Sequence, residues 1–74
     1  MQERPWKNIY PTLKWWMERE DRGPDWLELV LYLNTMQVRN RLCGRTEFAR
    51  LEQERLAELT GIPRKMLFRK EGEE

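Results

Sequence analysis

Residues 53–70 read QERLAELTGIPRKMLFRK, and the interpretation of the whole chain depends on this stretch. Its last eight residues, PRKMLFRK, contain Arg64, Lys65, Arg69 and Lys70 and no acidic residue. The 74-residue chain carries a formal net charge of only +1, so this local excess of positive charge does not follow from the overall composition. Basic residues segregated on one short segment are typical of a local anion-binding surface.

Small and aliphatic residues in the same stretch predict two helices joined by a tight turn. Gly61 permits the positive φ that such a turn requires, and Ala57 is small enough to lie where two helices cross. Ile62 and Leu67 are predicted to fill the space between the helices, and Pro63 suits the first turn of the second helix. A helical hairpin that uses this turn only for packing is the alternative.

The spacing of Gln53, Ala57, Gly61, Ile62 and Leu67 resembles the helix-turn-helix of the repressor and Cro type. In that family the second helix lies in the major groove of DNA and the first helix crosses the backbone. The resemblance implies a recognition helix over residues 63–70, with Leu67 facing inward. It departs from the family at Lys70, where a core aliphatic residue is usual. The DNA contacts that it implies are made by Gln53, Arg64, Lys65, Phe68, Arg69 and Lys70.

A looser resemblance covers more of the chain. The order PDWLELVLYLN (24–34), a polar link and LAELTGIPRK (56–65) is similar to the winged-helix N-terminal domains of phage and plasmid replication-initiation proteins. That resemblance implies a short strand at 47–51. We expect no complete wing, because the sequence up to Glu74 offers no segment for the wing hairpin. From the residues alone, segment 45–60 could instead be one helix with four apolar side chains inward: Phe48, Leu51, Leu56 and Leu59.

Gly and Pro residues divide the chain into helical segments of one small domain spanning residues 1–74. We expect an all-α bundle of three to five helices, because apolar residues recur at helical spacing in each segment. The second segment is predicted to be one central helix with Trp26, Leu29, Val30, Leu33 and Met36 on its main apolar face. The expected helices cover about 11–20, 25–42, 46 or 52 to 60, and 63–70, followed by an acidic tail at 71–74.

Several function classes are disfavoured by composition. The chain has no histidine and a single cysteine, Cys43, so neither a nucleophilic triad nor a zinc-type site can be assembled from it. We therefore expect no enzyme activity, no metal, no cofactor and no small-molecule substrate. No apolar run approaches the roughly 20 residues that span a bilayer, and the start MQERPW does not resemble a secretory signal. A cytoplasmic protein without a membrane partner is expected.

The sequence favours a DNA-binding protein that recognises a specific sequence, acting as a phage, plasmid or bacterial regulator or as a replication accessory. One recognition helix buries only a modest area on DNA, so we expect a homodimer or a larger protein partner, with Trp6 and Trp15 in the contact surface. The rival hypothesis is a small protein-binding adaptor or phage-type inhibitor that binds no nucleic acid. Four tryptophans and an acidic tail beside the recognition helix favour this rival.

Overall fold

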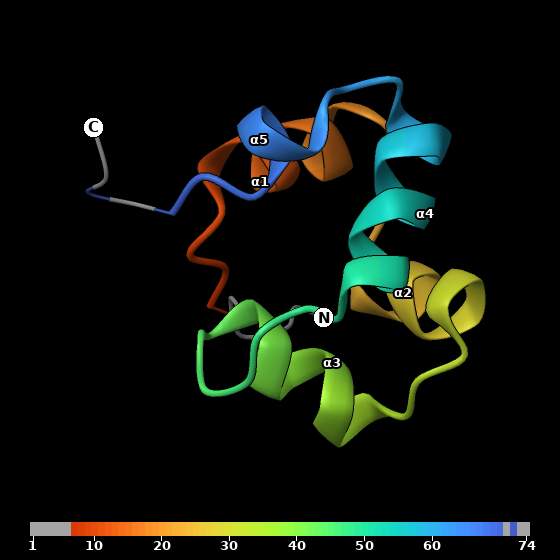
Figure 1. The fold of residues 1–74 in the computed structure, drawn as a ribbon. Helices are drawn as coiled ribbons and strands as arrows, with labels where there is room; N and C mark the ends of the chain where they lie inside the picture. The colour runs from red at the N-terminus through yellow and green to blue at the C-terminus, as the bar shows by residue number, and fades with distance from the viewer. Residues whose placement is uncertain (1–6, 71, 73–74) are drawn as a thin grey trace.

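The computed structural model describes residues 7–70 and 72, which form an all-helical fold with no strand in this part of the chain. The helices surround one hydrophobic core, and Figure 1 shows α4 linking the α2–α3 region to the α1–α5 region. The expected all-α bundle is confirmed. Five helices follow one another through the described residues: α1 (Pro11–Arg19), α2 (Pro24–Leu31), α3 (Thr35–Leu42), α4 (Arg50–Thr60) and α5 (Arg64–Leu67).

Helix α1 begins at Pro11, where the missing backbone N–H of proline removes no helical hydrogen bond. Leu13 and Met17 are four residues apart and both are buried. Tyr10, the residue just before the helix, is also buried, and its backbone N–H donates to Asn8 Oδ1 at 2.9 Å. The apolar stripe of this segment therefore faces the core as its helical spacing predicts.

The predicted helix over residues 25–42 is wrong, because the chain breaks it into α2 and α3. Tyr32 adopts a left-handed conformation with φ 57° and ψ 47°, and Asn34 then begins α3 with a capping box. Asn34 Oδ1 accepts from the Gln37 N–H at 2.8 Å, and Gln37 Oε1 accepts from the Asn34 N–H at 2.9 Å. Thr35 Oγ1 also donates to the Glu28 carboxylate at 3.0 Å, which ties the start of α3 to α2.

The break between α2 and α3 changes which side chains of residues 25–42 are buried. Leu27 and Leu31 of α2 are buried, and so is Val38 of α3. Leu29 is 72% exposed and Met36 is 66% exposed, although both were predicted to face inward. After the break α3 no longer continues the axis of α2, so a single helical periodicity cannot describe both apolar faces.

Residues 47–51 do not form the strand that the second resemblance implies, nor does a helix begin at residue 46. Phe48 is 3% exposed, and its ring anchors the segment between α3 and α4 in the core. Helix α4 then begins at Arg50. The start of the helix is fixed by two side chains, since Glu52 Oε1 accepts from the Ala49 N–H and Gln53 Nε2 donates to the Phe48 carbonyl, both at 2.9 Å. These contacts satisfy backbone groups that a strand would have to pair elsewhere.

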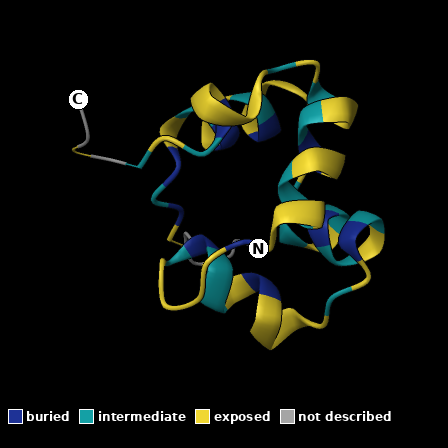
Figure 2. Cartoon of the chain, viewed as in Figure 1, coloured by how far each residue is buried: buried dark blue, intermediate teal, exposed yellow. Residues whose placement is uncertain are grey.

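Among residues 7–70 and 72, ten buried apolar residues form the core, and they come from every helix and from the segments before α1 and α4. In Figure 2 the buried segments face the interior of the arrangement, while the outer surfaces of α3 and α4 are largely exposed. The core consists of Tyr10, Leu13, Met17, Leu27, Leu31, Val38, Leu42, Phe48, Leu56 and Leu67.

Candidate nucleic-acid interface

The turn between α4 and α5 has the geometry that the sequence predicts. Gly61 has φ 76° and ψ 12°, and its N–H donates to the Ala57 carbonyl at 2.9 Å. A Cβ atom at this position would meet no atom within 4 Å, so glycine is favoured by its backbone conformation rather than by space. Thr60 Oγ1 accepts from the Ile62 N–H at 3.2 Å and donates to the Leu56 carbonyl at 2.8 Å, which holds the two sides of the turn together.

The residues assigned to the turn and its packing lie at this junction. Leu67 is fully buried, as predicted, and Ile62 packs against the core while half-buried. Ala57 is also half-buried and lines an open groove with Gly61 and Ile62. The fully buried Leu56 of α4 and Leu67 of α5 thus anchor the two helices in the core, while the small residues Ala57 and Gly61 lie at the junction.

A shallow depression at the start of α5 brings together four of the six side chains that the resemblance assigns to DNA. Its lining consists of Tyr10, Glu47, Gln53, Arg64, Lys65 and Phe68. Arg64 Nε donates to Gln53 Oε1 at 3.3 Å, so the first residue of α5 is linked directly to α4. Arg64 and Lys65 are exposed, as is Arg69 just outside the depression.

Two of the basic side chains are paired with acids. Lys70 Nζ lies 2.8 Å from Glu47 Oε2, and Arg64 Nη1 lies 3.9 Å from Glu54 Oε2. Lys65 and Arg69 have no ion-pair partner among residues 7–70 and 72. The four positive charges of this segment are therefore unequal, because the Lys70–Glu47 contact is short while no acid among the described residues pairs with Lys65 or Arg69.

The prediction that Phe68 projects outward is wrong. Its ring is half-buried and lies 5.5 Å from the Tyr10 ring and 5.1 Å from the Phe48 ring, measured between centroids. Tyr10 and Phe48 are themselves in edge contact at 5.5 Å. This three-ring cluster attaches the end of α5 to the core, since aromatic pairs at such distances are favourable in tilted and edge-on arrangements.

The recognition helix is also shorter than the predicted 63–70. Helix α5 contains only Arg64–Leu67, with Pro63 as its N-cap and Phe68 as its C-cap. The chain leaves the helical conformation at Phe68, whose ring packs into the cluster. Arg69 and Lys70 consequently follow the helix instead of continuing its exposed face.

The two predicted partner-interface residues have different outcomes. Trp15 is 53% exposed on α1, and the Arg19 guanidinium lies 5.2 Å from the centroid of its ring. Trp6 and the acidic residues Glu71, Glu73 and Glu74 lie outside the described residues. Six other large apolar side chains among the described residues are exposed: two were predicted to face inward, two more would face inward only if residues 45–60 formed one helix, and no role was predicted for the last two. These exposed side chains are Leu29, Tyr32, Met36, Leu51, Leu59 and Met66.

Within the described part of the chain, no three His, Cys, Asp or Glu side chains lie close enough to hold a metal ion together. The helices described there are also too short or too polar to span a membrane. Comparison of the chain with protein-family models, curated proteins and solved structures finds no match. Any assignment of function therefore depends on the geometry of the α4–α5 junction itself.

Proposed function

We propose that this protein binds double-stranded DNA through the junction of α4 and α5, and that it recognises a specific DNA sequence. The observation that carries the proposal is the placement of Gln53, Arg64 and Lys65 around one shallow depression beside the Gly61 turn. A polar side chain at the start of one helix and basic side chains at the start of the next can contact a phosphate and the groove beside it together.

The charges around this depression support phosphate binding. Lys65 and Arg69 are exposed and carry charge that no described acid neutralises. The contact of Arg64 with Glu54 is long, and both side chains are more than two-fifths exposed. An exposed ion pair of this kind contributes little stability, so Arg64 can exchange Glu54 for a phosphate at small cost. Lys70 would have to leave its closer partner Glu47, and we assign it a weaker contribution.

The short helix limits what one copy of the chain can recognise. Helix α5 is four residues long, and a single small module buries only about 600–1,000 Å² on DNA. We therefore assign this protein the role of one half of a homodimer or one component of a larger assembly. The resemblance to repressor and replication-initiation domains favours a phage, plasmid or bacterial regulator or replication accessory.

Fluorescence anisotropy with short random duplex DNA at several salt concentrations tests the proposal. Lys65→Ala should weaken binding and reduce the slope of log affinity against log salt by about one unit. Arg39→Ala is the matched control, because Arg39 is an exposed arginine on α3 and its loss removes the same charge. Wild-type protein that does not bind DNA at low salt, or equal effects of the two substitutions, would refute the proposal.

A protein-binding adaptor is the second candidate, and the exposure of Trp15 favours it. A tryptophan ring that is 53% exposed on a helix is a typical centre of a protein interface. In this case the wild-type protein would ignore duplex DNA at every salt concentration. Trp15→Ala would then abolish capture of the partner without changing the melting temperature by more than about 2 °C.

A further inference from the structure

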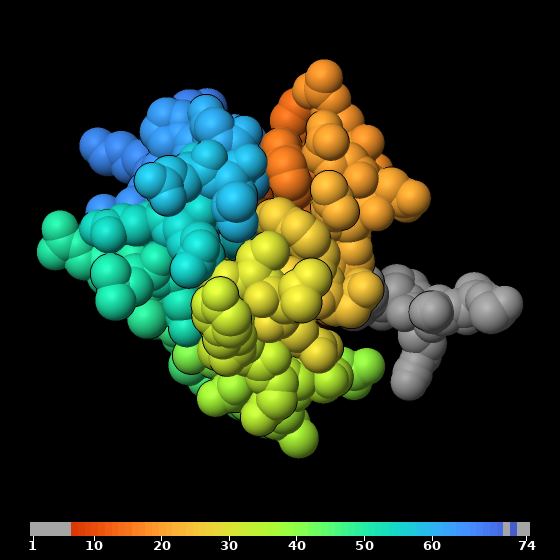
Figure 3. All heavy atoms as spheres, turned by 90° about the vertical axis from the view of Figure 1, so that its right-hand side faces the viewer, coloured from red at the N-terminus to blue at the C-terminus, as the bar shows by residue number. Residues whose placement is uncertain are grey.

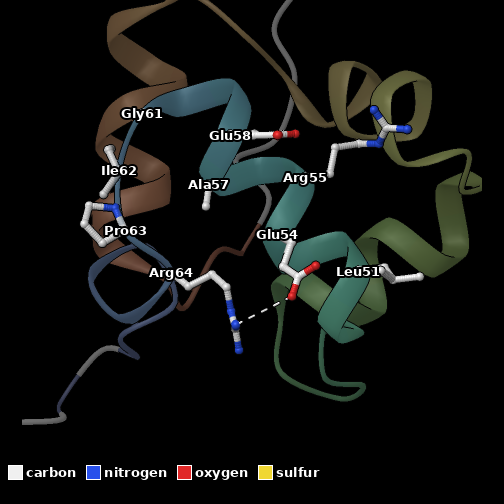
Figure 4. A pocket seen from close by; sticks show the side chains of 9 residues that line it. All are labelled: Leu51, Glu54, Arg55, Ala57, Glu58, Gly61, Ile62, Pro63 and Arg64. Atoms are coloured by element: carbon white, nitrogen blue, oxygen red, sulfur yellow. Dashed lines mark ion pairs between the residues drawn. The ribbon is translucent and has the colours of Figure 1, made fainter.

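An open groove runs along the outer side of α4, and its lining has a pattern that a second copy of the same surface would match. Figure 4 shows Leu51 at one end of the groove, Ile62 and Pro63 at the other, and the small side chain of Ala57 between them. Arg55 and Glu58 extend from α4 on the side away from the Arg64–Glu54 pair. The groove is therefore apolar at both ends and carries one charge of each sign along one edge.

The two charges on this edge are not neutralised by any described residue. Neither Arg55 nor Glu58 has an ion-pair partner among the described residues. The Arg55 guanidinium instead lies 5.7 Å from the centroid of the Tyr32 ring, which is 82% exposed. Figure 3 shows the face of the molecule on which α2 and α4 lie beside each other, so this contact extends the groove surface onto the end of α2.

We propose that this groove is a homodimer interface in which the α4 helices of two copies pack antiparallel across a two-fold axis. When two identical helices pack antiparallel across a two-fold axis, the residue numbers of the two residues that face each other add up to the same total for every facing pair. A sum of 113 places Arg55 of one copy opposite Glu58 of the other, and the symmetry repeats this ion pair. The same register brings Leu51 to the end of the partner's α4, where Ile62 and Pro63 line the groove just beyond the helix, so each end of the groove meets an apolar side chain. Such self-complementarity is what an isologous interface requires.

The apolar exposure on this side of the molecule is consistent with a second copy. Leu51, which lines the groove, is 78% exposed, and Leu59, eight residues later on α4, is 46% exposed. Large exposed apolar side chains on one helix favour an interaction surface. An 11-residue helix is about 16 Å long, so an α4 pair with the Tyr32 contact forms a small interface, and we expect a dissociation constant of about 10 μM.

The inference does not depend on the DNA-binding proposal. Lys65 and Arg69 lie outside the groove, and only Arg64 lines both the groove and the depression at the start of α5. A chain that dimerises without binding DNA would support this inference and refute the proposed function. The reverse result would refute this inference alone.

Sedimentation velocity at protein concentrations from about 1 to 500 μM tests the proposal. Two charge-reversal variants are used, each of which places like charges at the interface and which restore opposite charges when they are mixed. Arg55→Glu places acid against acid across the two-fold axis, and Glu58→Arg places base against base. Each variant alone should be at least about tenfold weaker as a dimer, because like charges at close range oppose association. An equimolar mixture of the two should form a heterodimer, since each arginine then faces a glutamate. Arg39→Glu is the control, because it reverses the charge of an exposed arginine on α3 that does not line the groove, and it should leave the dimer unchanged.

Circular dichroism of each variant checks the fold, which we expect to be intact because both side chains are outside the core. Recovery of dimer in the mixture would also exclude misfolding as the cause of dissociation. Wild-type protein that stays monomeric up to 500 μM, dimers that survive both single substitutions, or a mixture that stays monomeric would overturn the proposal.

Discussion

The turn between α2 and α3 and the turn between α4 and α5 use the same backbone conformation with different residues. Tyr32 has φ 57° and ψ 47°, and Gly61 has φ 76° and ψ 12°; each donates its N–H to the carbonyl four residues earlier. Glycine adopts this left-handed conformation freely, whereas a residue with a Cβ atom loses about 1–2 kcal/mol there. The α4–α5 turn is therefore favoured by Gly61 itself, whereas the α2–α3 turn must be stabilised by the residues around Tyr32.

The residues around Tyr32 stabilise the turn between α2 and α3. The capping box of Asn34 and Gln37 begins a new helix two residues later, and Leu31 and Val38 on either side are buried. Burial of two such side chains stabilises the fold by about 3–6 kcal/mol, which exceeds the cost of the strained tyrosine. The comparison shows that a helix break can be imposed by flanking caps and core contacts without a glycine at the break.

The largest expected effect concerns the core that both turns depend on. Leu67→Ala should lower the free energy of unfolding by about 2–5 kcal/mol, because Leu67 is fully buried and its removal leaves a cavity. Leu29→Ala, in an exposed position of α2, should change it by less than about 0.5 kcal/mol. Urea denaturation followed by circular dichroism measures both. Similar losses for the two leucines would contradict the burial described for α2 and α5.

The comparison also explains which parts of the fold could be predicted. Gly61 and Leu67 were predicted correctly because the signal for the α4–α5 turn is local: one residue allows the turn and another six positions later fills the core. The signal for the α2–α3 break is local as well, since Asn34 and Gln37 have the spacing of a capping box. It was outweighed by the apolar residues on both sides, whose spacing could be fitted to one continuous helix.

The candidate site was predictable only in part, for a different reason. Gln53, Arg64 and Lys65 come together because they flank one turn, and the distance along the chain between them is short. The positions of Phe68 and Lys70 depend on Phe48, Tyr10 and Glu47, which lie 20 or more residues away. No helical periodicity in residues 63–70 contains information about those partners.

The next prediction tests the turn that glycine favours. Gly61→Val should lower the free energy of unfolding by about 1–3 kcal/mol, since a β-branched residue resists positive φ. The loss cannot come from a clash of its Cβ atom, because that atom would have open space around it. Thermal denaturation measures the change, and Gly61→Ala should show a smaller loss of about 1 kcal/mol. An unchanged melting temperature for Gly61→Val would exclude the left-handed conformation at this residue.

A smaller loss is expected at the cap that helps to hold the other turn. Asn34→Ala removes the acceptor of the Gln37 N–H and should cost about 1 kcal/mol. Asn34→Ser, which keeps a capping oxygen, should lose only a few tenths of a kcal/mol. Both changes are measurable by urea denaturation. If alanine were tolerated as well as serine, the start of α3 would be set by core contacts alone.

The smallest expected effect is that of replacing Tyr32, and the informative result is whether the free energy of unfolding rises or falls. Asparagine tolerates the left-handed conformation better than tyrosine, so Tyr32→Asn should relieve about 1 kcal/mol of strain. It also removes the contact with Arg55, which at this exposure contributes about 0.5 kcal/mol. The net result should be a gain in stability of a few tenths of a kcal/mol, measured by urea denaturation at low protein concentration. In an Arg55→Ala background the contact is already absent, and the same substitution should then gain nearly the full 1 kcal/mol. A loss of stability in both backgrounds would mean that the conformation of Tyr32 is not strained, and that its ring is held by more than Arg55.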